Sequence, residues 1–246
     1  MTRPTLEETA VPAKPLTLLG KWAERPQETS APALREHDPL FALVTSPTVR
    51  RALQPVAERL LGQTQGGVFC VASAEPGEGR TVVAATLSLM LSESTEKGVL
   101  LVDAHLRNPS VRALFGLPDS PGLAECLRGE CRFLPAVSTV GGLRVLPAGR
   151  DESPARLFST PAAKRLVEQL RDTCNLTLID LPPLTSSSEA ATLCDWSDGT
   201  IMVVRANSTR ASTVLRAVEM IDRRKVVGVV LNRERQELPR WLERLL

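Results

Sequence analysis

The sequence predicts an α/β fold in which a single doubly wound domain carries a mostly parallel sheet. From Gly67 onward, short apolar runs alternate with amphipathic stretches, which is the pattern of successive β-α units. A glycine-rich segment separates the first apolar run from the first amphipathic stretch, and two later apolar runs end at an aspartate. The 246 residues, 43% hydrophobic and 24% charged, are enough for one such domain with an appendage.

The N-terminal segment differs from the rest of the chain in composition. Residues 1–47 are rich in Pro, Thr, Glu and Ala and are predicted to form a disordered tail, because they cannot bury enough surface to offset the entropy of ordering. Within this tail, Pro39 to Val44 is apolar enough to dock. Residues 48–246 are predicted to form the domain, and Thr48 to Gly62 has the apolar spacing of a helix packed on the core or on a neighbouring subunit.

The order of the predicted elements follows the alternation of apolar and amphipathic segments. Strands are expected at Val68–Ala72, Val99–Asp103, Leu143–Pro147, Leu176–Asp180, Thr200–Arg205 and Val226–Leu231. Helices are expected at Thr81–Ser94, Pro121–Leu127, Pro161–Thr173, Ser187–Leu193 and Ser208–Arg224.

The glycine-rich segment has the form of a phosphate loop. Residues 73–81 read Ser-Ala-Glu-Pro-Gly-Glu-Gly-Arg-Thr, so Arg80 stands where the pattern G-K-[ST] has lysine. Such a loop wraps phosphates with backbone N–H groups at the positive end of the next helix. The residues predicted to bind nucleotide here are Pro76, Gly77, Glu78, Gly79, Arg80, Thr81 and Val82.

Two strand-end carboxylates are candidates for the chemistry beside that loop. Asp103 and Asp180 each end a buried strand, and in an open parallel sheet the carboxyl ends of the strands form the ligand-binding edge. Together with Thr81 they offer oxygen ligands of the kind that Mg²⁺ needs beside phosphates. Taken one at a time, each aspartate is also explained as a residue that favours turns.

Composition bounds the classes of partner. The 30 basic residues balance 28 acidic ones without a basic tract, so no nucleic-acid partner is predicted. The five cysteines show neither disulfide-framework nor zinc spacing, which fits a reducing cytoplasm. No apolar run approaches about 18 residues, so we expect no membrane span and any membrane association to need a partner.

Several linked motifs now resemble those of one family. They are Asp103-Ala-His-Leu-Arg-Asn-Pro109, Leu114-Phe-Gly-Leu-Pro118, Pro121-Gly-Leu123, Leu143-Arg-Val-Leu-Pro-Ala-Gly149, Pro154-Ala-Arg-Leu157, Leu178-Ile-Asp-Leu-Pro-Pro183, Asp198-Gly199, Val203-Val-Arg205 and Gly228-Val-Val-Leu-Asn-Arg233. In this order they resemble the bacterial tyrosine kinases that serve capsule and exopolysaccharide assembly. The resemblance covers about residues 66–233 and extends to the wider class of Min/Par-type P-loop ATPases.

The resemblance implies a role for each matching position. It implies ATP or ADP with Mg²⁺ as cofactors, Asp103 as the base toward an incoming hydroxyl, and Asp180 as the Walker B ligand. Thr81, Asp103 and Asp180 would hold the metal, and Arg80 would contact the phosphates. Asn232 would lie near the adenine, although a simple turn residue explains it equally well.

Departures from the family pattern leave catalysis open. Arg80 replaces the lysine that neutralises the transferred phosphoryl group. His105 replaces the second carboxylate of D-x-D, which would alter metal binding. The alternative is that His105 is a surface loop residue without a role in the site. The sequence contains no tyrosine, so a tyrosine-rich tail cannot exist here. Residues 48–61 lack an E-x-x-R-x-x-R pattern, so a homo-oligomer is possible but ring assembly of the family's kind is not indicated.

The predicted function is that of a degenerate member of this family. It would bind ATP or ADP and regulate exopolysaccharide or capsule biosynthesis and export through a membrane polysaccharide co-polymerase or a related kinase, from the cytoplasmic side. One alternative is an active tyrosine kinase or ATPase acting in trans. Another is a Min/Par-type positioning ATPase. The amphipathic segment Leu238–Leu246 is predicted to close the core as a helix or to dock on a partner.

Overall fold

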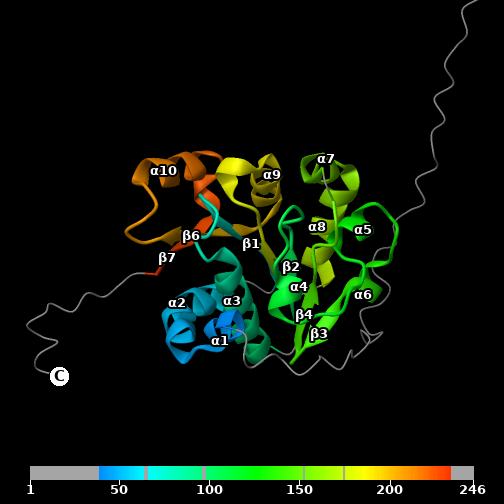
Figure 1. The fold of residues 1–246 in the computed structure, drawn as a ribbon, viewed down its shortest axis with the longest axis horizontal. Coiled ribbons are helices and arrows are strands. Elements are labelled where there is room, and N and C mark those ends of the chain that lie inside the picture. The colour runs from blue at the N-terminus through cyan, green and yellow to red at the C-terminus, as the bar shows by residue number, and fades with distance from the viewer. Residues whose placement is uncertain (1–38, 64–65, 96–97, 152, 174, 234–246) are drawn as a thin grey trace, which may run out of the picture.

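The computed structural model describes residues 39–63, 66–95, 98–151, 153–173 and 175–233, which form a helix-covered seven-stranded sheet (Figure 1). The strands are β1 (Gly67–Ser73), β2 (Val99–Asp103), β3 (Ser138–Val140), β4 (Leu143–Leu146), β5 (Leu176–Asp180), β6 (Gly199–Arg205) and β7 (Val226–Asn232). Their order is β3-β4-β2-β5-β1-β6-β7, and every neighbouring pair is parallel except β3 with β4. The predicted doubly wound, mostly parallel α/β fold is confirmed.

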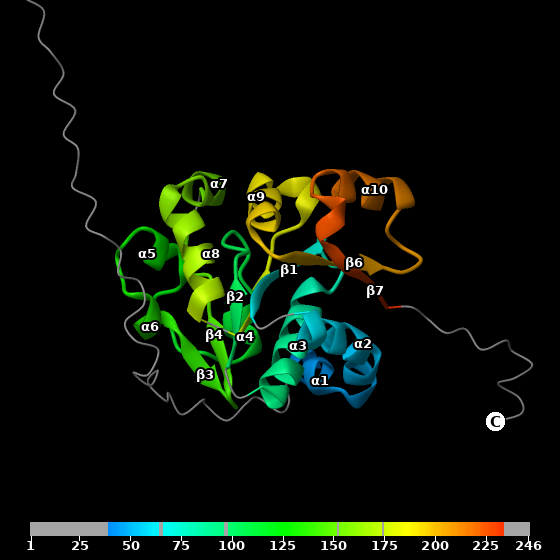
Figure 2. The ribbon, with the colours of Figure 1, turned by 180° about the vertical axis from the view of Figure 1, so that it is seen from behind.

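Helices cover both faces of the sheet, and the rear view separates the same two groups (Figure 2). One layer contains α1 (Pro39–Thr45), α2 (Pro47–Gln63), α3 (Arg80–Ser94) and α4 (Val111–Leu114). The other layer contains α5 (Leu123–Leu127), α6 (Phe133–Ala136), α7 (Pro154–Phe158), α8 (Pro161–Thr173), α9 (Ser188–Trp196) and α10 (Ala211–Glu219). Two short 3₁₀ turns, η1 (Leu184–Ser186) and η2 (Arg223–Lys225), complete the elements.

Strand β1 shows why the first apolar run has no polar face. Its successive side chains point to opposite faces of the sheet, because the period of a strand is two residues. Val68 and Cys70 join the core under α5 to α10, whereas Phe69 and Val71 join the core under α1 to α4. All four are buried. A continuous apolar strand is therefore the expected sequence of a central strand covered on both sides.

The described residues begin inside the segment predicted as a tail. Helix α1 occupies Pro39–Thr45 and packs against α2 and α3, and Val44 is 0% exposed. The apolar stretch from Pro39 to Val44 therefore docks on the core, as predicted. It does so as a short helix, which was not predicted because so few residues show little periodicity. Residues 1–38 and 234–246, which include the predicted C-terminal helix or docking segment, lie outside the described residues.

Other differences from the predicted elements are local. The helix predicted at Ser208–Arg224 is shorter in the structure, where α10 spans Ala211–Glu219. After α10, the Asp222 side chain accepts a hydrogen bond from the Arg224 amide and η2 begins. Strand β3 was not predicted, since its three residues are too few for a periodicity signal. Among the described helices, none combines the length and the hydropathy needed to cross a bilayer.

The sheet brings the predicted carboxylates to one edge. In the parallel register, Asp103 of β2 pairs with Asp180 of β5, and Asp180 pairs with Val71 of β1. The segment that follows β1 is the glycine-rich loop, so the loop and both aspartates lie at the carboxyl ends of three adjacent central strands. This is the position at which open α/β sheets bind ligands.

Candidate functional site

The loop between β1 and α3 has the backbone of a phosphate cradle. Gly77 and Gly79 have φ values of +77° and +90°, which other residues rarely adopt, and α3 begins immediately afterwards at Arg80. Within the described part of the chain, the amides of Gly77, Gly79 and Thr81 donate to no acceptor. N–H groups at a helix start carry partial positive charge, so they are available to an anion. Pro76 and Gly77 are exposed at the tip, and Thr81 and Val82 are half-buried in the first turn.

Glu78 holds this loop against the rest of the domain. Its side chain is buried, with the residue 2% exposed. One carboxylate oxygen accepts from the Glu75 amide at 2.7 Å, and the other accepts from the Arg205 amide at 3.1 Å and the Thr209 hydroxyl at 2.5 Å. Glu78 therefore anchors the loop to the turn between β6 and α10 and is directed away from the loop's mouth.

Asn232 braces the loop from the end of β7. Its side-chain amide donates to the Glu78 carbonyl at 2.8 Å, and a Cβ placed on Gly79 would lie 1.9 Å from the Asn232 Nδ2. This close approach explains why position 79 needs glycine in addition to its positive φ. The prediction that Asn232 lies near the adenine stays a prediction, because its described contacts are with the loop.

Arg80 is buried in the centre of the site. Its Nε donates to Asp180 Oδ1 at 2.8 Å and its Nη1 donates to Ser73 Oγ at 2.9 Å, while Nη2 lies 3.4 Å from Nδ1 of His105. The side chains of Arg80 and Asp180 are 7% and 0% exposed, so they form a buried ion pair. The structure thus brings Arg80 to the Walker B position, a contact that the sequence did not predict.

Thr81 completes a second contact with the same carboxylate. Its hydroxyl donates to Asp180 Oδ2 at 2.6 Å and accepts from Ser110 Oγ at 3.3 Å. Both oxygens of Asp180 are therefore engaged. Ser73 and Ser110 are site residues that the sequence analysis missed, because single serines beside a loop carry no distinctive pattern.

Asp103 lies beside this pair and is fixed by backbone amides. Its oxygens accept from the amides of His105, Ser110 and Val111 at 3.0 to 3.1 Å, and the residue is 0% exposed. Burial and the neighbouring Asp180 carboxylate raise the pKa of Asp103 to about 7, against the opposing effect of the three amides. The carboxylate thus orders the loop between β2 and α4.

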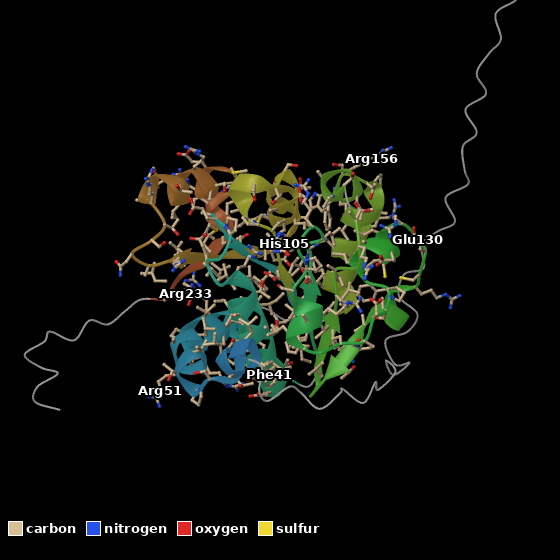
Figure 3. The ribbon with its side chains drawn as sticks, in the orientation of Figure 1. Phe41, Arg51, His105, Glu130, Arg156 and Arg233 are labelled. Carbon is tan, nitrogen blue, oxygen red and sulfur yellow. The ribbon has the colours of Figure 1, made fainter. Side chains whose placement is uncertain are left out.

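His105, which Figure 3 labels near the centre of the molecule, lies on the far side of the Arg80 guanidinium. Burial and the charge of Arg80 lower the pKa of His105, so the imidazole is neutral near pH 7. A neutral ring can accept a hydrogen bond from Arg80 through Nδ1. His105 therefore contacts a residue of the site. This differs from the alternative interpretation, in which His105 is a surface loop residue without a role.

The predicted metal ligands meet, and each of them already contacts other groups of the protein. Thr81 and Asp180 are in contact, and Asp103 is the register neighbour of Asp180. However, the charge of Asp180 is matched by Arg80, and Asp103 is engaged by three amides. No group of three or more His, Cys, Asp or Glu residues in the described part of the chain could hold a metal. Beside a nucleotide, Mg²⁺ is usually held by one or two carboxylates together with phosphate oxygens and waters, so the pairing of Asp180 with Arg80 bears directly on whether it can bind here.

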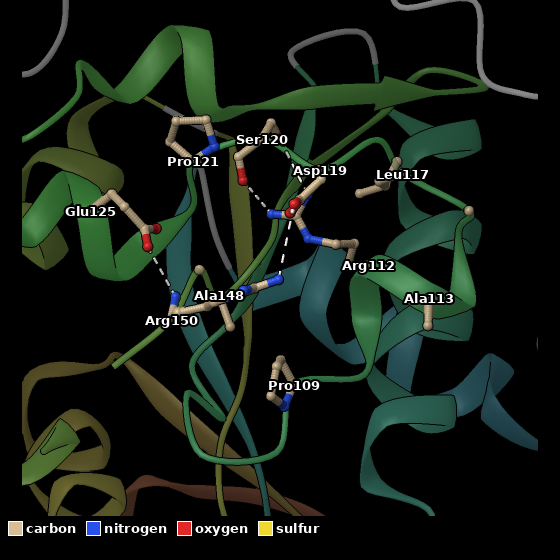
Figure 4. A pocket seen from close by; sticks show the side chains of 12 residues that line it. Pro109, Arg112, Ala113, Leu117, Asp119, Ser120, Pro121, Glu125, Ala148 and Arg150 are labelled. Carbon is tan, nitrogen blue, oxygen red and sulfur yellow. Dashed lines mark hydrogen bonds and ion pairs between the residues drawn. The ribbon is translucent and has the colours of Figure 1, made fainter. Parts of the chain in front are cut away.

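A pocket of about 740 Å³ lies beside this site, lined by residues between Pro109 and Arg150 and by none from the loop (Figure 4). Arg112 points across it and pairs with Asp119, while Glu125 accepts from the Arg150 amide at 3.0 Å. The sequence analysis did not identify these residues as pocket-forming. The residues that line the pocket come from three separate segments of the sequence, and only the fold brings these segments together.

The raised pKa of Asp103 predicts a pH dependence of stability. The folded state holds this proton more tightly than the unfolded chain, so the contribution is present below about pH 4 and is lost as the pH rises through about 7. Between pH 5 and pH 8 the wild type should lose roughly 2 to 3 kcal/mol of unfolding free energy through this group, relative to Asp103→Asn. Urea unfolding of both proteins at the two pH values measures this difference. Asp119→Asn, which changes a side chain that is 83% exposed, is the control and should show no such pH dependence. If the stability difference between the wild type and Asp103→Asn were the same at both pH values, the raised pKa of Asp103 would be refuted.

Comparisons with known proteins agree with this geometry. A family model of ParA proteins, described as NUBPL iron-transfer P-loop NTPase, matches residues 66–242. The tyrosine-protein kinase YwqD of Bacillus subtilis is 30% identical over 167 residues, which are 66% of this chain and 70% of YwqD. The succinoglycan biosynthesis transport protein ExoP of Rhizobium meliloti is 30% identical over 185 residues, which are 72% of this chain but only 23% of ExoP.

Solved structures show the same relationship. The kinase domain of VpsO superimposes with a TM-score of 0.71 at 30% identity, covering 76% of this chain and 95% of that domain. The kinase domain of the Escherichia coli tyrosine kinase ETK gives 0.71 at 25% identity, covering 81% and 82%. The septum site-determining protein MinD of Pyrococcus horikoshii, complexed with Mg-ADP, shares the fold with a TM-score of 0.59 at 20% identity, covering 71% of this chain and 74% of MinD. The chain therefore belongs to the ParA-type P-loop NTPases and, within them, to the bacterial tyrosine kinases.

Proposed function

We propose that this protein binds ATP or ADP in its phosphate loop and regulates exopolysaccharide or capsule biosynthesis and export with little or no phosphoryl transfer of its own. The observation that carries the proposal is the buried ion pair between Arg80 and Asp180. The loop keeps the backbone needed to hold phosphates, whereas the cation expected to act on the transferred phosphate is bound elsewhere.

The chemistry of phosphoryl transfer explains why turnover should be slow. Catalysis depends on positioning and on positive charge placed at the transferred phosphoryl group. Arg80 directs its Nε and one terminal nitrogen to Asp180 and Ser73. The sequence also contains no tyrosine, so this chain cannot phosphorylate itself on that residue.

The relatives support the biological part of the proposal. ExoP is named as a succinoglycan biosynthesis transport protein, and the similar proteins YwqD, Etk and CpsD are named as tyrosine-protein kinases. We propose a membrane polysaccharide co-polymerase or a related kinase as the partner, which would place this protein at the inner face of the membrane. Affinity purification from the native cell should recover such an envelope component, and deletion of the gene should alter the surface polymer. Recovery of none, with an unaltered polymer, would contradict the regulatory role.

Nucleotide binding itself is tested by titration of the purified protein. Calorimetry with ATP and with ADP should show binding, and each nucleotide should raise the melting temperature, because a ligand that binds only the folded state stabilises it by about 2.7 kcal/mol at a hundredfold excess over Kd. Release of phosphate from radiolabelled ATP should stay near the uncatalysed rate. Absence of both heat and thermal shift would refute the proposal.

An active kinase or ATPase acting in trans is the second candidate. It is favoured by the pKa of Asp103, which burial and Asp180 raise to about 7, close to the value that suits a general base. Against it, Asp103 is fully buried and held by three amides. Turnover of ATP or of a tyrosine-containing substrate that vanishes in Asp103→Asn would establish this candidate.

A further inference from the structure

The carboxylate at the Walker B position already has a cationic partner. Arg80 Nε lies 2.8 Å from Asp180 Oδ1, and the two side chains are 7% and 0% exposed. A guanidinium stays protonated in proteins, so with the Asp180 carboxylate it forms a neutral pair. Asp180 consequently offers no net negative charge to a second cation.

The guanidinium is also held in place by neutral groups on either side. Nη1 donates to Ser73 at the end of β1, and Nη2 lies 3.4 Å from His105 after β2. Arg80 thus joins the ends of three adjacent strands, β1, β2 and β5. Of its five N–H donors, these described contacts engage three, which leaves two for phosphate oxygens.

The remaining candidates for holding a divalent cation are weak. His105 offers a nitrogen where a carboxylate would offer hard oxygens. The Asp103 oxygens accept three backbone amides, and the Thr81 hydroxyl already contacts both Asp180 and Ser110. The groups around the loop therefore offer hydrogen-bond donors and no unpaired carboxylate charge, which suits an anion better than a magnesium ion.

We propose that this protein binds ATP and ADP as free anions without Mg²⁺, because Arg80, as the partner of Asp180, already occupies the place of a divalent cation. This inference rests on the proposed nucleotide binding. The N–H groups of the loop, the start of α3 and the two remaining N–H donors of Arg80 would hold the phosphates.

The test compares the affinity for ADP in excess MgCl₂ with that in EDTA, by calorimetry on the purified full chain. The wild type should bind with dissociation constants within about threefold of each other in the two buffers. Arg80→Lys frees part of Asp180, because an ammonium cannot contact Ser73, Asp180 and His105 together. That variant should lose at least about tenfold in affinity when Mg²⁺ is removed. Arg107→Lys, an exposed arginine beside the site, is the matched control and should behave as the wild type does.

The outcomes separate this inference from the one it rests on. Wild-type binding that requires Mg²⁺ overturns the inference and leaves nucleotide binding intact. No binding in either buffer overturns the proposed function and this inference with it. The wild-type comparison decides the question even if Arg80→Lys does not fold, which its melting temperature reports.

Discussion

Arg80→Ala is expected to lower the free energy of unfolding by about 3 to 5 kcal/mol, because it leaves a buried carboxylate without its charge partner. Asp180 is 0% exposed, so without Arg80 its charge is left in a buried site. The variant also leaves Ser73 without its contact to Arg80. Urea unfolding at neutral pH, followed by circular dichroism, measures the change.

The matched control is an exposed ion pair on the same domain. Arg223 and Glu219 are paired at 3.4 Å with side chains 61% and 64% exposed, and Arg223→Ala should cost no more than about 1 kcal/mol. The double variant Arg80→Met with Asp180→Leu should recover most of the stability lost in Arg80→Ala, since neither buried charge then remains. Equal losses in Arg80→Ala and Arg223→Ala would show that the buried pair does not form in solution.

Gly79→Ala is expected to destabilise the protein by about 2 to 4 kcal/mol and to weaken nucleotide binding at least about tenfold. The positive φ of +90° alone costs about 1 to 2 kcal/mol for a residue with a Cβ. The added Cβ would also lie 1.9 Å from Asn232 Nδ2, so Asn232 must move and lose its bond to the Glu78 carbonyl. Such a lost hydrogen bond costs about 1 kcal/mol more.

Gly77→Ala separates these two causes. Gly77 has a similar φ of +77°, but apart from its two chain neighbours no residue has an atom within 4 Å of the position that a Cβ would take there. This variant should therefore show only the backbone cost of about 1 to 2 kcal/mol. Thermal and urea unfolding of the two variants, with ADP titrations alongside, give the comparison. If Gly77→Ala were as destabilising as Gly79→Ala, the contact with Asn232 would not be the cause.

The sequence predicted the central strands and the loop well, because both depend on local patterns. Each apolar run of β1, β2 and β5 is bounded by polar or glycine residues, and two of them end at the predicted aspartates. The loop was identified from glycines whose positive φ the fold requires. These features are encoded within a few consecutive residues.

The partner of Arg80 could not be predicted in the same way. Its contacts Ser73, His105 and Asp180 lie at the carboxyl ends of three different strands, so their proximity can be predicted only when the sheet order is known. The same reason applies to the pocket beside the site. Helix α1 was missed because seven residues show too little periodicity, although their burial against α3 orders them.

The contacts of Glu78 and Asn232 mean that the loop cannot move as an independent flap. One buried carboxylate fastens it to the backbone at Arg205 and to Thr209, and one amide fastens it to the last strand. Any shift of Gly79 must therefore displace the approach to α10 and the end of β7 as well. If the loop binds nucleotide as proposed, we expect the occupant to alter β7, which is an outer strand of the sheet.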